Sequence, residues 1–73
     1  MKKHLIRLTY DTKKGGIATV MSTMSDEVFK GFNLVSLAAH ALAKQVREDN
    51  PKLELGRLRE YRYFGVEDEV QIV

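Results

Sequence analysis

The residues that could carry out acid–base or nucleophilic chemistry are few in this chain. Its only histidines are His4 and His40, and it contains no cysteine. Nucleophilic catalysis needs a hydroxyl or thiol beside a base, and Ser36 precedes His40 by four residues, a spacing at which side chains touch on a helix. Such contacts are common on solvated helices, and neither histidine has a carboxylate at ligand spacing. We therefore predict no enzymatic activity, no cofactor and no metal site.

Two further motifs resemble functional sites but fit ordinary turns better. Gly15 and Gly16 lack the Lys-Ser/Thr pair of a phosphate-binding loop, and they stand between two expected strands. Glu67, Asp68 and Glu69 are consecutive in the sequence, whereas the paired carboxylates of an enzyme lie on facing elements in a cleft. Both motifs are expected to be hairpin turns.

Basic and aromatic residues alternate near the end of the chain. Four of them occupy the odd positions from 57 to 63, a spacing that predicts one face of a strand. Arginines neutralise phosphates and tyrosines stack on bases, so a sheet face that displays both can bind single-stranded nucleic acid. Alternatively, the tyrosines pack beneath a helix and the arginines protect a strand edge. The candidate nucleic-acid surface, with basic residues of the first hairpin, comprises Lys3, Arg7, Lys13, Lys14, Arg57, Arg59, Tyr61 and Tyr63.

A long helix is expected over residues 25–48. Ser25 is a good N-cap, acidic residues follow it where the helix dipole favours negative charge, and Asn50-Pro51 must end the helix. At about 100° per residue, one stripe of apolar side chains forms the predicted core face. That stripe comprises Val28, Phe32, Val35, Ala39, Leu42 and Val46.

A second apolar group lies on another side of the same helix. Leu34, Leu37 and Ala41 cluster roughly 140° from the core stripe. A helix on one sheet needs a single apolar stripe, so the second group must meet another part of the chain or another molecule. These three residues are the candidate partner surface.

The rest of the chain predicts strands. Residues 3–10 alternate with a period of two, and their even positions are expected to face the helix. A turn at residues 11–16 then leads to a second strand at residues 17–23.

After the helix, residues 51–58 fit either an extended segment leading into a strand, which we favour, or a short helix with Pro51 at its first position. Residues 57–64 and 70–73 predict a second hairpin around a turn at residues 65–69. The sequence therefore predicts a single α+β domain over residues 1–73, in the order β-β-α-β-β. A four-stranded antiparallel sheet would carry one long helix on one face.

Size and charge limit the functions that this chain can have. It has 73 residues, a net charge of +2 and no apolar run of the roughly 18 residues needed to span a membrane. Residues 1–24 carry a net charge of +4 and the remainder −2, a weak bias for a dedicated nucleic-acid protein. The expected function is a small cytoplasmic protein-interaction or regulatory module that forms a homodimer or binds a larger target. Nucleic-acid binding is the alternative.

Overall fold

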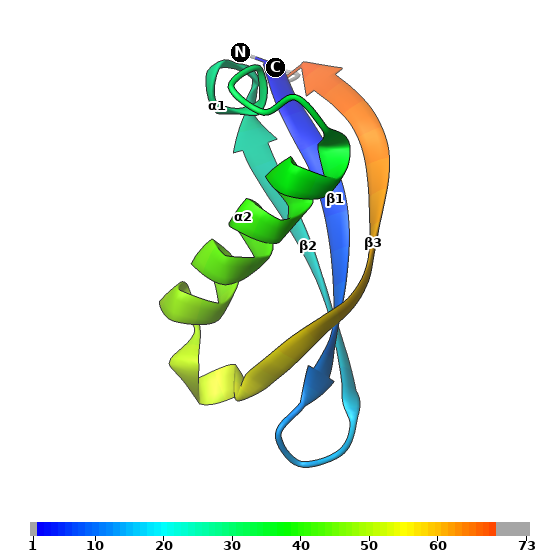
Figure 1. Cartoon of the computed structure of the whole chain (residues 1–73), viewed down its shortest axis with the longest axis vertical. Coiled ribbons are helices and arrows are strands. Elements are labelled where there is room, and N and C mark those ends of the chain that lie inside the picture. The colour runs from blue at the N-terminus through cyan, green and yellow to red at the C-terminus, as the bar shows by residue number, and fades with distance from the viewer. Residues whose placement is uncertain (1, 69–73) are drawn as a thin grey trace, which may run out of the picture.

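The computed structural model describes residues 2–68, which form one α+β domain with a single helical layer over one face of a sheet (Figure 1). The sheet has three antiparallel strands in the order β2-β1-β3. The elements are β1 (Lys2–Thr12), β2 (Ile17–Ser25), α1 (Asp26–Phe29), α2 (Val35–Asp49), the single 3-10 turn η1 (Pro51–Leu53) and β3 (Leu55–Asp68).

β1 is the central strand, and its alternating sequence explains why. Every even position from His4 to Tyr10 is buried beneath the helical layer, which confirms the predicted inward face. Ile6, Leu8 and Tyr10 are fully buried and form the middle of the core. Because neighbouring side chains of a strand point to opposite faces, the odd positions of β1 lie on the face that the helices leave uncovered.

The first hairpin is confirmed. Its register runs from Lys3 opposite Ser25 to Asp11 opposite Ile17. The turn needs a residue with positive φ, and Gly15 supplies it at 88° without steric cost.

The single helix predicted over residues 25–48 is wrong, because the chain leaves the helical conformation after α1. Ser25 does cap α1, accepting a hydrogen bond from the Val28 amide at 3.4 Å. Gly31 and Asn33 then follow, both of which are poor helix formers, and Leu34 is extended with φ −132° and ψ 144°. A second, longer helix, α2, begins at Val35. The apolar periodicity continues through residues 30–34, but their local preferences do not support a helix.

α2 packs on the sheet through small residues. Ala38, Ala39 and Ala43 are almost completely buried, together with Leu42 and Val46. The Tyr10 hydroxyl donates a hydrogen bond of 2.8 Å to the carbonyl oxygen of Ala43, which ties β1 to the helix.

The predicted core stripe is therefore confirmed only in its second half. Ala39, Leu42 and Val46 belong to the core, whereas Phe32 packs against it while partly exposed. Val28 is 54% exposed. The helix break turns the first half of the stripe away from the direction that a continuous helix would give it.

The second hairpin, and with it the four-stranded sheet, is also wrong. β3 continues through the expected turn as far as Asp68, which pairs with Lys2 of β1. Gly65, with φ 97°, lies inside this strand beside a register shift rather than in a turn. The strand expected at residues 70–73 lies outside the described residues. Within residues 2–68 the order is β-β-α-β.

Residues 51–55 contain both features that the sequence suggested as alternatives, a short helical turn and an extended lead-in to a strand. Pro51 begins the 3-10 turn η1, Glu54 adopts a left-handed conformation with φ 52°, and β3 starts at the buried Leu55. The chain thus makes one helical turn and then extends. No helix within residues 2–68 has the length and apolar character required to cross a membrane.

Candidate functional site

The candidate partner surface on α2 is exposed. Leu34 and Leu37 are 60% and 50% exposed, and Ala41 is exposed beside them. Leu37 and Ala41 lie on the side of α2 that faces away from the sheet, because the core residues occupy the opposite side of the helical wheel. Leu34 is the N-cap residue directly before α2. We call Leu34, Leu37 and Ala41 the α2 surface.

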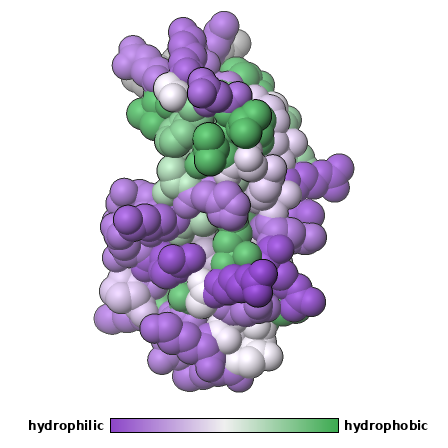
Figure 2. Space-filling model, in the orientation of Figure 1, coloured by the Kyte–Doolittle hydropathy of each residue, from purple (hydrophilic) through white to green (hydrophobic). Residues whose placement is uncertain are grey.

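A shallow hollow adjoins the α2 surface between the end of β2, α1 and α2. Its volume is about 300 Å³, and Val28, Phe32 and Ala41 contribute to its lining. Figure 2 shows apolar residues gathered over the end of the molecule that carries α1, with polar residues around them. The apolar surface therefore extends from α2 onto the segment that the helix break displaces.

The odd-numbered residues of β3 do not share one face, contrary to the sequence analysis. The strand has register shifts opposite Leu5/Ile6, Thr9/Tyr10 and Tyr10/Thr12. Each shift inserts residues that have no partner in β1, so the inward and outward positions exchange. A sequence pattern with a period of two cannot reveal these insertions.

As a result, Tyr61 and Tyr63 lie on one face of the sheet and Arg59 lies on the other. Tyr61 and Tyr63 lie opposite Leu8 and Ile6 on the helical side of the sheet, as in the alternative arrangement. Arg59 lies on the other face, where its guanidinium contacts the Asp11 carboxylate at 3.2 Å. We call this uncovered side of the sheet the open face.

The open face carries a basic and aromatic cluster that sequence analysis missed. Arg7 pairs with Arg62 across β1 and β3. Their guanidinium carbons lie 5.7 Å and 5.1 Å from the centroid of the Phe64 ring. Only Arg7 was included in the predicted surface, because Arg62 and Phe64 occupy even positions in the sequence.

Two other predicted residues meet at the hairpin end of the molecule. Lys13 and Arg57 line an open hollow of about 520 Å³ together with Arg47 of α2. The Arg47 Nε is buried and has no hydrogen-bond partner among the described residues. Glu54 also lines this hollow, and its carboxylate is paired with Lys14 at 3.5 Å. Three cationic side chains around one hollow can bind an anionic group through charge-assisted hydrogen bonds.

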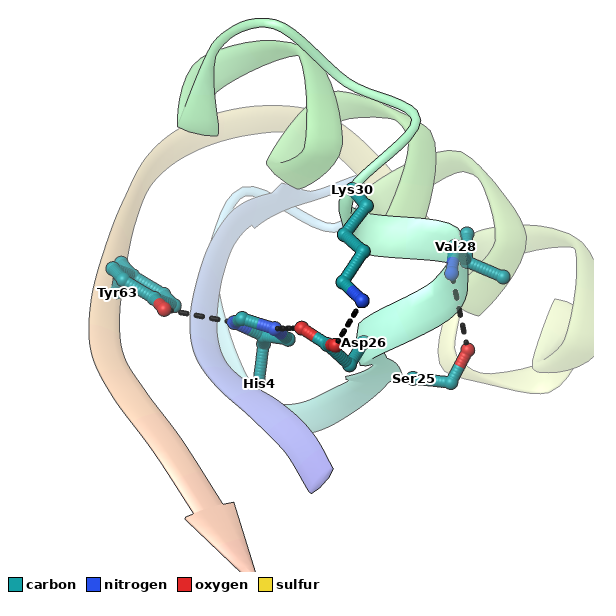
Figure 3. Close-up of polar contacts among 6 residues, drawn as sticks. All are labelled: His4, Ser25, Asp26, Val28, Lys30 and Tyr63. Atoms are coloured by element: carbon teal, nitrogen blue, oxygen red, sulfur yellow. Dashed lines mark hydrogen bonds and ion pairs between the residues drawn. The ribbon is translucent and has the colours of Figure 1, made fainter. Parts of the chain in front are cut away.

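His4 is at the centre of a buried polar network at the opposite end of the sheet (Figure 3). Its Nδ1 lies 2.8 Å from the Tyr63 hydroxyl, and its Nε2 lies 2.8 Å from Asp26 Oδ1. The Phe29 ring stacks on the imidazole at a centroid distance of 3.7 Å. Lys30 contacts the second oxygen of the Asp26 carboxylate at 3.1 Å. From the sequence, His4 was predicted only as a strand residue, because its partners come from two distant elements, α1 and β3.

The hydrogen bonds of this network favour the ionised form of Asp26. The hydrogen bond from His4, followed by that from Lys30, lowers the pKa of Asp26 below its usual value. The carboxylate is therefore ionised in the folded protein.

At the other end of the core, burial raises the pKa of Tyr10, while the Arg47 charge opposes that effect.

The second histidine does not form the Ser36 contact that its spacing allows. His40 is exposed and lies edge-on to the Tyr61 ring, with the ring centroids 6.4 Å apart. Within residues 2–68, no three histidine, aspartate or glutamate side chains gather closely enough to hold a metal ion.

Comparison with known proteins found no match for this chain. No protein-family model matches it, and neither the curated proteins nor the solved structures contain a significant match.

Proposed function

We propose that this chain is a non-enzymatic protein-interaction module that self-associates through the α2 surface. The observation that carries the proposal is the exposure of Leu37 on the outer side of α2 and of Leu34 directly before this helix, whose core contacts are made by other residues. Fully burying a leucine side chain contributes about 1.5 to 3 kcal/mol. A domain of this size has a small core and gains stability from association.

The residues around the α2 surface support a twofold contact. Lys44 and Glu48 are exposed on the same side of α2, about two turns beyond Leu37 and Ala41 respectively. In a twofold dimer the same patch meets itself, so residues of opposite charge at its edge can pair across the interface. The apolar α2 surface thus has a positive and a negative side chain at its edge, Lys44 and Glu48, which can pair with each other across a twofold axis.

The oligomeric state tests this proposal. We expect sedimentation equilibrium or light scattering to show a dimer whose dissociation constant rises more than about 100-fold in the double variant Leu34→Lys plus Leu37→Lys. The matched control is Leu53→Lys, which places a lysine at an exposed apolar position on η1 and should leave the dimer intact.

Two outcomes would overturn the proposal. A parent protein that is monomeric at every concentration excludes self-association. A double variant that remains folded and dimeric places the interface elsewhere, for example along the free edge of β2. Circular dichroism separates a folded monomer from an unfolded chain. The single variant Leu37→Ala, which introduces no charge, should still weaken the dimer if the double variant does not fold.

A further inference from the structure

The open face is the second large surface that no element of residues 2–68 covers. Its central row runs from Met21 through Arg7 to Arg62, one residue from each strand. Phe64 is 45% exposed next to this row, and Met21 is exposed at its other end. The face therefore offers aromatic and apolar contact area around two positive charges. It is separate from the α2 surface, which lies on the helical side.

The pairing of Arg7 with Arg62 has an energetic consequence. Like charges directly opposite each other on neighbouring strands destabilise a sheet. No carboxylate of the described residues contacts either guanidinium, whereas Arg59 on the same face is held by Asp11. An anion placed between the two arginines would remove this repulsion.

The Phe64 ring restricts the kind of anion that fits. Both guanidinium groups lie within 6 Å of the ring centroid, so cation–π attraction holds them near the ring. A planar base can stack on the exposed ring or on a guanidinium plane, while the phosphates beside it meet the positive charges. A simple inorganic anion would use only the arginines and leave the ring unoccupied.

We propose that the cluster of Arg7, Arg62 and Phe64 binds single-stranded nucleic acid. The aromatic ring stacks against a base, and the two arginines contact the phosphates. Bases in a duplex are already stacked and paired, so an aromatic side chain on a sheet reaches them only in single strands. This site differs from the predicted Arg/Tyr surface, because the tyrosines lie on the helical side of the sheet.

Fluorescence anisotropy with a labelled single-stranded DNA of about 12 nucleotides tests the proposal, since single-strand-binding OB folds cover about 4 to 16 nucleotides. An RNA strand of the same sequence forms a second arm, and a duplex DNA forms a third. We expect both single strands to bind more tightly than the duplex. Phe64→Ala should weaken single-strand binding by about 5-fold to 150-fold, the range measured for loss of one stacking contact. Phe64→Tyr keeps the aromatic ring and should restore binding.

The arginines are tested by the salt dependence of the same binding. Between about 50 mM and about 200 mM salt, each lost phosphate contact reduces the slope for a single strand by about 0.7. The double variant Arg7→Gln plus Arg62→Gln should therefore lower the slope by about 1.4. Lys52→Glu changes the net charge by the same amount from an exposed position on η1, and it should leave the slope nearly unchanged. Leu53→Ala is the matching apolar control for Phe64→Ala.

Several results would overturn the proposal. One is that neither single strand binds, and another is that the duplex binds more tightly than the single strands. A third is that Lys52→Glu lowers the affinity for single strands as much as the arginine double variant does. A fourth is that a polyglutamate peptide displaces the labelled strand as effectively as unlabelled single-stranded DNA does. Thermal melting shows whether each variant is folded. Because the repulsion between the arginines is removed, the double variant should melt at or above the temperature of the parent, and a marked fall in melting temperature would contradict the argument about like charges.

Discussion

Nε2 of His4 lies 2.8 Å from Oδ1 of Asp26, which links the buried start of β1 to the first residue of α1. The imidazole also contacts Tyr63 of β3, so one side chain joins three elements. Phe29 covers it from the last position of α1. This contact explains why α1 is folded onto the sheet although it is only four residues long and buries none of them completely.

The Asp26 carboxylate should make stability depend on pH in the acid range. Its pKa is lowered in the folded protein, and an unfolded aspartate titrates at about 3.9. The carboxylate thus stabilises the fold fully above about pH 3.9 and loses this contribution as pH falls through its lower folded pKa. Urea unfolding from pH 7 to pH 2 should show Asp26→Asn less stable than the parent at neutral pH, with the two curves converging in acid. A constant difference over the whole range would show that the carboxylate charge is not responsible.

Removing the Tyr63 hydroxyl should destabilise the fold measurably. In Tyr63→Phe, Nδ1 of the buried His4 loses its partner, and the loss of a hydrogen bond to a buried group costs about 1 to 2 kcal/mol. Tyr61→Phe is the matched control two residues away, because the Tyr61 hydroxyl has no hydrogen bond within the described residues; its effect should stay within about 0.5 kcal/mol. Chemical denaturation of both variants provides the comparison. Equal stabilities would mean that the His4 contact is unimportant.

Core substitutions should distinguish the two halves of the predicted apolar stripe. Leu8 is fully buried beneath α2, so Leu8→Ala should cost about 2 to 5 kcal/mol, a large share of the stability of a small domain. Phe32 is only partly buried after the helix break. Phe32→Ala should therefore cost less than Leu8→Ala, although phenylalanine is larger. Denaturation midpoints that rank the two variants in the opposite order would indicate that residues 30–34 pack more tightly than the structure shows.

The sequence was most informative where each residue's conformation depends on its near neighbours. The even positions of β1 alternate without interruption, and Gly15 and Gly16 mark a sharp turn before the next strand pattern, so the first hairpin followed directly. Asn50-Pro51 likewise marked the end of α2 within two residues. The exposed positions of Leu37 and Ala41 followed from the helical period.

Long-range pairing decided the remaining features. Gly31 and Asn33 disfavour a helix at the break, but the position of α1 on the sheet involves Phe29 stacking on His4, a contact between residues 25 positions apart that no helical pattern contains. The faces of β3 depend on where its register shifts fall against β1: Arg59 has no partner at one shift and contacts Asp11, whereas Tyr61 and Tyr63 lie opposite Leu8 and Ile6 on the helical side. A sequence fixes the period of a strand but not the extra residues that a neighbouring strand leaves unpaired. For this reason the sequence determined the central strand, its hairpin and the outer side of α2, whereas only the tertiary structure decided which charged and aromatic side chains of β3 meet on the open face.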